Sequence, residues 1–342
     1  MMQEAIKAVI ARHDFSREEA REIMQCIMSG DATPAQIGAF VVAEKLKGET
    51  YQEVAGFAEA MRENATEVKT RRGAAVDLCG TGGDGRGTFN ISTVASFVVA
   101  AGGVPVAKHG NRSVSSRCGS ADLLEALGVK IDLDAGQMGA CLDELGLAFL
   151  YAPALHPAMR HAVGPRREIG VRTVFNILGP LTNPARVRRQ LLGVYDAALA
   201  PLMAAVLREL GADHVWVIHS EDGLDEISIH APTRVVELKD GEIREHRLEP
   251  ETFGLNGQNG NGILGGTPEE NARIALDVLQ GKPGPARDVV LVNAACGFLV
   301  GGRVEDVRGG LALAQEMLDS GAALDKLHGL VRITNDKFQI KN

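Results

Sequence analysis

The spacing of apolar residues changes near residue 73, and this change limits the chain to a two-part fold. In the first 65 residues the apolar positions recur at helical spacing, with no strand pattern. Three capping boxes mark helix starts there, at Ser16/Glu19, Thr33/Gln36 and Thr50/Glu53. A small all-helical N-terminal domain is therefore expected over residues 1–70.

From about residue 73, short apolar runs alternate with helical patterns, which is typical of a mainly parallel sheet flanked by helices. The apolar runs are AAVDLC, VPVA, LAFLYA, LLGVY, HVWVIH and DVVLVNAA. The helical patterns between and after them include 134–145, 199–210 and 267–280. We therefore expect a larger α/β domain over 71–342, with helices near 155–185 joining the first domain. The fold class predicted is α/β with a small helical N-terminal domain.

Two later segments depart from this alternation. Residues 234–248 read as two strands around Asp240-Gly241, which predicts an antiparallel hairpin. The segment 254–266 is rich in glycine and asparagine, and this composition favours a surface loop over a ligand cradle.

A glycine-rich loop follows the first strand and predicts an anion-binding site. It spans 80–88, reads GTGGDGRGT, and leads into a helix expected to begin near Asn90 to Ser92. Glycines let backbone N–H groups approach phosphate oxygens, and a helix N-terminus adds free N–H groups and a favourable dipole. Gly80, Gly82 and Gly85 also satisfy GxGxxG. However, a dinucleotide fold needs an acid about 20 residues later, and the next strand runs into a lysine and a histidine instead. The NTPase motif GxxxxGK[ST] is absent as well.

A loop of cations, hydroxyls and an amide follows the second strand, over 108–120. Lys108 and Arg112 can supply positive charge, while Ser115, Ser116 and backbone N–H groups can orient a phosphate. A solvated basic loop is the alternative interpretation. Because ligands bind at the carboxyl ends of parallel strands, this segment and the glycine-rich loop are expected to share one site.

An acidic cluster, HSEDGLDE over 219–226, follows the strand HVWVIH. Its adjacent carboxylates Asp225 and Glu226 repel each other unless solvent or a cation separates them. Most acidic loops are merely exposed. Beside two phosphate-binding loops, however, the pair is a candidate Mg²⁺ site, since Mg²⁺ bridges carboxylates to substrate phosphates.

The composition excludes several classes of protein. A net charge of −8 argues against a nucleic-acid or acidic-membrane surface. No apolar run reaches the roughly 18 residues of a membrane helix. The five cysteines are scattered and never spaced as CxxC, so neither a disulfide framework nor a zinc site is expected. The first residues lack an apolar signal core, and a cytoplasmic location is expected.

The joined motifs closely resemble the anthranilate phosphoribosyltransferase family of tryptophan biosynthesis. The resemblance rests on DLCGTGGDGRGTFNIST, VAKHGNRSVSSRCGSADLLEALG, RREIGVRTVFNILGPLTNPA, HSEDGLDEIS and PEENA, and it runs essentially end to end. It implies transfer of the phosphoribosyl group of phosphoribosyl pyrophosphate (PRPP) to the amine of anthranilate, with release of pyrophosphate. It also implies Mg²⁺ as cofactor and a homodimer formed through the helical N-terminal domain, with no nucleic-acid or membrane partner.

The same resemblance assigns residues to substrates and metal. For PRPP it implies Gly80, Gly83, Asp84, Thr88, Asn90, Ile91, Ser92, Thr93, Lys108, His109, Gly110, Asn111, Arg112, Ser113, Val114, Ser115, Ser116 and Ser120. For Mg²⁺ it implies Ser92, Asp225 and Glu226, and for anthranilate Gly80, Asn111 and Arg166. No nucleophile-and-base pair is recognisable. Because an unprotonated aromatic amine can attack without a strong base, Lys108, His109 and Asn111 are expected to act by charge and positioning.

Two alternatives remain at this point. A pyrimidine nucleoside phosphorylase shares the architecture and a glycine-rich phosphate loop, but KHGNR and RTVFNILGPLTNP favour the transferase. A non-catalytic relative that binds nucleic acid would show a basic face and degraded magnesium residues, whereas the net charge is negative and the pair Asp225-Glu226 is intact.

Overall fold

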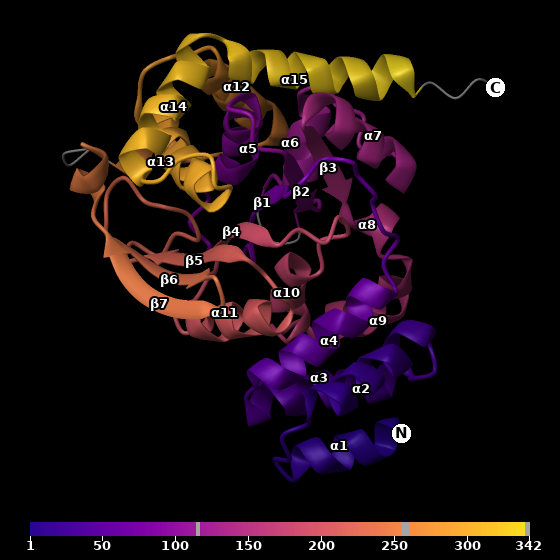
Figure 1. The fold of residues 1–342 in the computed structure, drawn as a ribbon. Helices are drawn as coiled ribbons and strands as arrows, with labels where there is room; N and C mark the ends of the chain where they lie inside the picture. The colour runs from indigo at the N-terminus through magenta and orange to yellow at the C-terminus, as the bar shows by residue number, and fades with distance from the viewer. Residues whose placement is uncertain (114–116, 255–259, 339–342) are drawn as a thin grey trace.

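Four N-terminal helices form a helical head. The computed structural model describes residues 1–113, 117–254 and 260–338 of the chain. The four helices are α1 (Met2–Ile10), α2 (Arg17–Ser29), α3 (Pro34–Lys47) and α4 (Tyr51–Glu63). All three predicted capping boxes are formed at the starts of α2, α3 and α4. Figure 1 shows the head at one end of the molecule, below the sheet. Helix α9 (Arg160–Ile169) packs against α2 and α3.

The larger part is built on one seven-stranded sheet in the order β3-β2-β1-β4-β5-β6-β7. The strands are β1 (Val76–Gly80), β2 (Val106–Gly110), β3 (Leu147–Tyr151), β4 (Arg189–Gly193), β5 (His214–Ser220), β6 (Thr233–Lys239) and β7 (Glu242–Leu248). The first five run parallel, and β6 and β7 form the predicted antiparallel hairpin, with Asp240 and Gly241 at positive φ. The predicted fold class is confirmed.

Helices cover both faces of the sheet, because successive side chains of each strand point to opposite sides. In β1, Leu78 belongs to the core under one layer and Cys79 to the core that continues into the head. The first layer holds α5 (Ile91–Ala101), α6 (Ser120–Ala126), α7 (Ala135–Leu145), α12 (Pro268–Leu279), α13 (Pro285–Val300), α14 (Val307–Asp319) and α15 (Ala322–Arg332). The second holds α10 (Phe175–Leu178) and α11 (Leu199–Glu209), and Figure 1 shows the sheet between the two layers.

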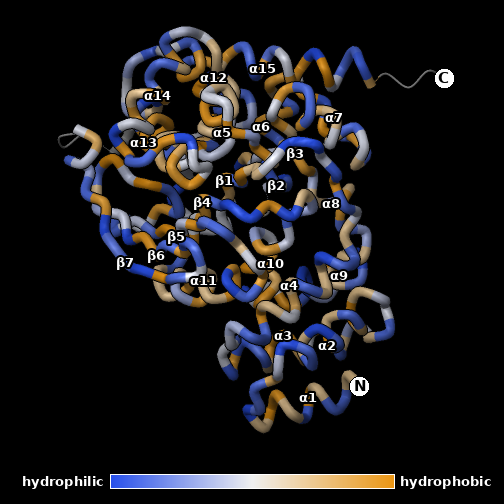
Figure 2. Tube along the Cα trace, in the orientation of Figure 1, coloured by the Kyte–Doolittle hydropathy of each residue, from blue (hydrophilic) through white to orange (hydrophobic). Residues whose placement is uncertain are grey.

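Several short turns of helix complete the chain, at α8 (Ala152–Leu155), η1 (Pro157–Met159), η2 (Gly179–Leu181), η3 (Pro250–Phe253), η4 (Gly260–Ile263) and η5 (Ile333–Lys337). Figure 2 shows that β7 is hydrophilic over most of its length, as expected for a strand at the edge of a sheet. Among the described residues, no helix is both long enough and apolar enough to cross a bilayer.

One predicted strand is wrong. The run DVVLVNAA (288–295) lies inside α13, which begins with Pro285 in its first turn. This helix is buried on almost every side from Val289 to Val300, between α5, α14 and the sheet. A helix that is apolar all round has no amphipathic period, so its sequence looks like that of a buried strand. The predicted helices 134–145, 199–210 and 267–280 correspond to α7, α11 and α12.

The strand order reverses between β1 and β4, and this reversal positions the site. From β1 the chain proceeds to β2 and β3 on one side, then crosses to β4 and β5 on the other. Where the strand order reverses, the loops that follow the neighbouring strands run in opposite directions, and a crevice forms between them at the carboxyl ends of the strands. The predicted loops after β1, β2 and β5 all leave from this edge of the sheet.

Candidate active site

Three loops meet at the carboxyl edge of the sheet, and we call them the glycine loop (80–88), the second loop (108–120) and the acidic loop (219–226). The buried ammonium of Lys108 joins the start of the second loop to the two elements that flank the glycine loop. It donates to the Leu78 carbonyl of β1 at 2.5 Å and to Ser92 Oγ at the start of α5 at 3.3 Å. The acidic loop joins at the same helix start, where the Ser92 N–H donates to Glu226 Oε1 at 3.2 Å. The fold thus brings the three predicted loops together.

The glycine loop is held open in a conformation that requires glycine. Gly82, Gly83, Gly85 and Gly87 all have positive φ, between 64° and 83°. The guanidinium of Arg172 donates to the Gly83 carbonyl at 2.5 Å and lies 4.0 Å over the ring of Tyr195. The loop is therefore fixed from outside by Arg172, which the sequence analysis did not single out.

The acidic loop places its carboxylates against glycines that leave room for them. A Cβ atom on Gly80 would lie 2.8 Å from Asp225 Oδ2. Gly193, the partner of Gly80 in the next strand, is packed even more tightly, because a Cβ there would overlap the Asp225 backbone carbonyl. Any larger residue at Gly80 would displace the Asp225 carboxylate.

Burial makes ionisation of the two acids costly. It raises the pKa of Asp225, and the nearby charge of Asp84 raises it further. It also raises the pKa of Glu226, with a further contribution from Asp225, while Lys108 opposes the rise. Asp84 contributes a third carboxylate, whose Oδ2 is buried without a hydrogen-bond partner. Acidic oxygens packed together in this way suit a cation that would neutralise them.

The described residues contain no cluster of three or more His, Cys, Asp or Glu side chains arranged to hold a metal alone. A cation at Asp225 and Glu226 would need other oxygen ligands, such as the Ser92 hydroxyl and oxygens of a substrate. Mg²⁺ is the cation for which this is usual, because it keeps few protein ligands and takes the rest from water and phosphates. The residues present therefore fit Mg²⁺.

The second loop differs from expectation at one cation. Arg112 is paired with two acids of α6, at 3.0 Å to Asp122 and 2.5 Å to Glu125. Its charge is thus partly neutralised in this conformation, and Lys108 is the buried cation that points into the site. Ser120 begins α6 and its Oγ donates to the Asn111 carbonyl at 3.2 Å. Val114, Ser115 and Ser116 lie outside the described residues.

Two histidines stand together beside the second loop. The rings of His109 and His156 are 5.1 Å apart, and the Nε2 atom of each is buried without a partner. Burial lowers the pKa of His109 to about 3 and that of His156 to about 4, so both are neutral at neutral pH. His156 was missed by the sequence analysis. It follows β3, the neighbour of β2 in the sheet. Its position after the carboxyl end of a parallel strand, where ligands usually bind, is the signal that could have identified it.

Arg166 lies on α9, with its guanidinium 5.2 Å from the centre of the Phe175 ring. Burial lowers the pKa of Arg166, and within the described part of the chain its side chain contacts the Phe175 ring but makes no ion pair or hydrogen bond. No hydrogen bond or ion pair among the described residues joins Arg166 to Gly80, at the end of β1, or to Asn111, after β2. An unpaired, partly buried guanidinium is suited to a planar carboxylate.

Comparison with known proteins gives a consistent result over nearly the whole chain. Residues 72–324 match the family model described as the glycosyl transferase family, a/b domain, and residues 3–65 match its helical bundle domain. An anthranilate phosphoribosyltransferase from Pelotomaculum thermopropionicum is 53% identical over 336 residues, covering 98% of this chain and 97% of that protein.

Solved structures agree with the sequence matches. The crystal structure of anthranilate phosphoribosyltransferase from Thermus thermophilus superimposes with a TM-score of 0.92 at 45% identity, covering 96% of this chain and 99% of that one. The enzyme from Saccharomyces cerevisiae in complex with PRPP and Mg gives a TM-score of 0.89 at 28% identity, covering 97% of both chains.

Proposed function

The chain belongs to the family of the anthranilate phosphoribosyltransferases, and from this premise we propose how its residues carry out the reaction. The enzyme transfers the phosphoribosyl group of PRPP to the amine of anthranilate, giving N-(5-phosphoribosyl)anthranilate and pyrophosphate, in tryptophan biosynthesis. Family membership decides against the nucleoside phosphorylase and nucleic-acid-binding alternatives.

We propose that PRPP lies over the glycine loop and the second loop. The single observation that carries this proposal is the meeting of Lys108, the N-terminus of α5 and four positive-φ glycines at one edge of the sheet. Positive-φ glycines expose backbone N–H groups, and an eleven-residue helix presents its positive dipole end there. The proposed contacts are those predicted at 80–93 and 108–120.

We infer that Ser92, Asp225 and Glu226 hold Mg²⁺, as the yeast relative is described with Mg. Two observations support the assignment, namely the raised pKa of both carboxyls and the buried Asp84 oxygen that lacks a partner. When bound, Mg²⁺ would neutralise charge on the pyrophosphate. Lys108, already placed between Leu78 and Ser92, would contribute a fixed positive charge to the same group.

We propose that anthranilate lies between Arg166, Asn111 and Gly80, with its carboxylate on the Arg166 guanidinium. Arg166 is suited to this because it carries no other anion among the described residues. The His109 ring bonds the Gly179 backbone, which favours a tautomer whose buried Nε2 is an acceptor. With a pKa near 3, this nitrogen is too weak a base to remove a proton, but it can orient the amine N–H.

The reaction then depends on positioning and charge rather than on a strong base. Breaking the bond at the anomeric carbon leaves positive charge on the ribose and negative charge on pyrophosphate. Lys108 and the backbone N–H groups of the glycine loop stabilise the departing anion. The amine of anthranilate is unprotonated at neutral pH, so its lone pair can attack the anomeric carbon once Arg166 has placed the ring. The nitrogen then carries a positive charge and loses one proton to water or to the released pyrophosphate, which gives the neutral amine of the product.

The double variant Asp225→Asn with Glu226→Gln tests the metal and PRPP assignments together. We expect the Mg²⁺ concentration for half-maximal activity to rise at least about tenfold, because two charged oxygen ligands become neutral. Asp222→Asn in the same loop is the matched control, since the Asp222 carboxylate accepts hydrogen bonds from Leu224 in the loop and from Ser228 just after it. An unchanged Mg²⁺ dependence of the double variant would remove both acids from the site.

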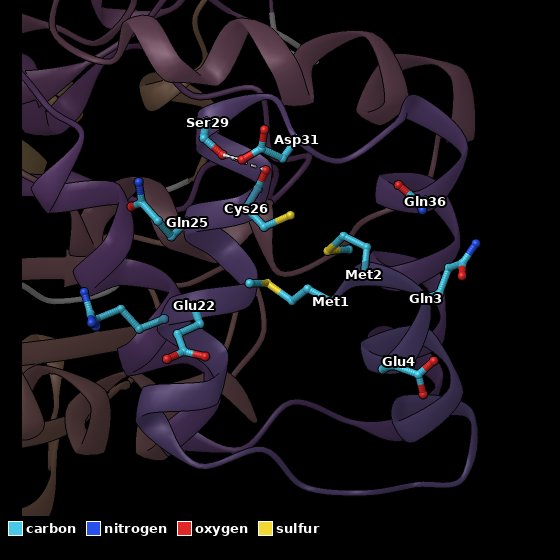
Figure 3. A pocket seen from close by; sticks show the side chains of 11 residues that line it. Met1, Met2, Gln3, Glu4, Glu22, Gln25, Cys26, Ser29, Asp31 and Gln36 are labelled. Atoms are coloured by element: carbon cyan, nitrogen blue, oxygen red, sulfur yellow. Dashed lines mark hydrogen bonds between the residues drawn. The ribbon is translucent and has the colours of Figure 1, made fainter.

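We also propose a homodimer formed through the helical head. Two large apolar side chains are exposed on the head, Ile10 at the end of α1 (70% exposed) and Leu46 on α3 (75%). A third, Val163 (53%), is exposed on α9, which packs against the head. An open groove of about 890 Å³ lies in the same head. The side chains of Met1, Met2 and Cys26 project toward it (Figure 3). None of the residues that line this groove belongs to the proposed substrate sites, which supports a role in contact between chains.

We also propose a cytoplasmic location, from the state of the cysteines. The structure contains no disulfide within its described residues, and four of the five cysteines are buried. Cysteines kept in this reduced form are usual in a reducing compartment.

A further inference from the structure

A segment remote in sequence packs directly on the end of the glycine loop. The Phe89 N–H donates to the Ile263 carbonyl at 3.1 Å, and the Gly265 N–H donates to the Gly87 carbonyl at 2.8 Å. Thr88 and Leu264 form an antiparallel bridge between these bonds. Residues 263–266, which we call the strap, are thus paired with the loop that the proposed function places under PRPP. From its glycine- and asparagine-rich composition, this segment was expected only to form a surface loop.

The strap leads into α12, whose first turn carries a buried asparagine. Asn271 is 2% exposed, and its Oδ1 accepts from the Gly266 N–H at 2.7 Å. Its Nδ2 donates to Asn90 Oδ1 at 3.0 Å, and Asn90 Nδ2 donates to the Cys118 carbonyl at 3.1 Å. One continuous set of hydrogen bonds therefore joins the strap, the start of α5 and the second loop.

The orientation of both amides is fixed by the ends of this network. The Gly266 N–H needs the side-chain oxygen of Asn271, and the Cys118 carbonyl needs the side-chain nitrogen of Asn90. The Cys118 Sγ also donates to Asn90 Oδ1, at 3.4 Å, which favours the same orientation of the Asn90 amide. The remaining nitrogen of Asn271 then meets the remaining oxygen of Asn90. Rotation of either amide by 180° would place two donors or two acceptors face to face, so the network is satisfied in one arrangement.

Asn90 itself occupies the N-cap of α5 but makes no side-chain capping bond. An N-cap asparagine usually accepts from the N–H groups of its own helix. Here Asn271 engages the Asn90 oxygen, and the Ser92 N–H instead meets Glu226. Asn271 thus helps to hold the Asn90 amide between the start of α5 and the second loop.

We propose that Asn271 is a positioning residue for phosphoribosyl transfer, which holds the glycine loop and the second loop in register for PRPP by fixing the side-chain amide of Asn90. This inference rests on the proposed function, in which Asn90 belongs to the PRPP site. Asn271 acts through Asn90 and is not itself a ligand of the substrate.

Asn271→Asp is the most selective test, because it keeps the acceptor for the Gly266 N–H and removes the donor to Asn90. We expect the KM for PRPP to rise about five- to tenfold, the effect of one lost buried hydrogen bond, with the KM for anthranilate changed less than about twofold. Asn271→Ala should raise the KM for PRPP at least as much. Asn64→Ala is the matched control, since Asn64 donates to Gln25 and the Ala60 carbonyl in the helical head, and it should leave both KM values unchanged.

Combination with Asn90→Ala separates this role from a general effect on folding. Asn90→Ala alone should raise the KM for PRPP, and adding Asn271→Asp should raise it no further, because the two residues act as one unit. Additive effects, or equal rises in both KM values together with a lower Tm, would overturn the positioning role. If Asn90→Ala raises the KM for PRPP and Asn271→Asp does not, only this inference fails. If Asn90→Ala leaves that KM unchanged, the proposed PRPP site fails as well.

Discussion

Replacing Arg166 with alanine is the perturbation that most sharply separates the two proposed substrate sites. The Arg166 guanidinium packs over Phe175, is partly buried, and has no ion pair among the described residues. A carboxylate held by its two parallel N–H groups would make a charge-assisted interaction worth about 1.5–3 kcal/mol. Its loss corresponds to a rise of about 10- to 150-fold in the KM for anthranilate.

The assay follows the loss of anthranilate fluorescence, varying each substrate in turn at a saturating concentration of the other. Arg166→Ala should raise the KM for anthranilate by that factor and the KM for PRPP by less than about threefold. Arg166→Lys should recover only part of the loss, because an ammonium lacks the planar fork. Arg167→Ala is the control, since Arg167 is the exposed neighbour on α9. Equal rises in both KM values, or an unchanged KM for anthranilate, would refute the reasoning.

Three further predictions concern the acidic loop, the head and the dimer. Gly80→Ala should lower kcat/KM at least about tenfold with little change in Tm, because the added Cβ would lie 2.8 Å from Asp225 Oδ2 and displace that carboxylate. Wild-type kinetics of this variant would contradict the position assigned to the Asp225 carboxylate. Burial and the neighbouring Glu53 raise the pKa of the fully buried Glu44 from 4.5 to about 8. As pH rises between these values, the Glu44 carboxyl ionises in the unfolded chain but not in the folded one, so the free energy of unfolding falls. Glu44→Gln should therefore add about 1–3 kcal/mol to the free energy of unfolding in urea at pH 8.5 and much less at pH 5, whereas a gain independent of pH would contradict the assignment. Leu46→Asp should give a monomer in light scattering coupled to gel filtration, and a dimer of unchanged mass would place the interface elsewhere.

Much of the fold could be predicted because local signals and tertiary structure agree. Each capping box in the head is formed as expected, since its bonds lie within four residues and need no distant partner. The hairpin at Asp240-Gly241 is equally local. The strand predicted over 288–295 failed for the opposite reason, because only the surroundings of α13 decide that such an apolar run is helical.

The loops of the site were predicted from their places after strands, whereas the contacts that hold them were not. Arg172, His156 and Asn271 lie 89, 47 and 181 residues from Gly83, His109 and Asn90, the residues they contact. Such pairs arise from packing of distant elements, which no periodicity records. Arg112 shows the same limit, because its acidic partners on α6 were visible in the sequence but their proximity was not.

The most direct test of the account is to mix the purified chain with anthranilate, PRPP and Mg²⁺ and to follow anthranilate fluorescence while pyrophosphate is measured in parallel. The account predicts loss of anthranilate with one pyrophosphate released for each molecule consumed, and no loss when PRPP or Mg²⁺ is omitted. Uridine or thymidine with inorganic phosphate should give no free base. Unchanged anthranilate in the complete mixture, or phosphorolysis of a nucleoside, would contradict the account.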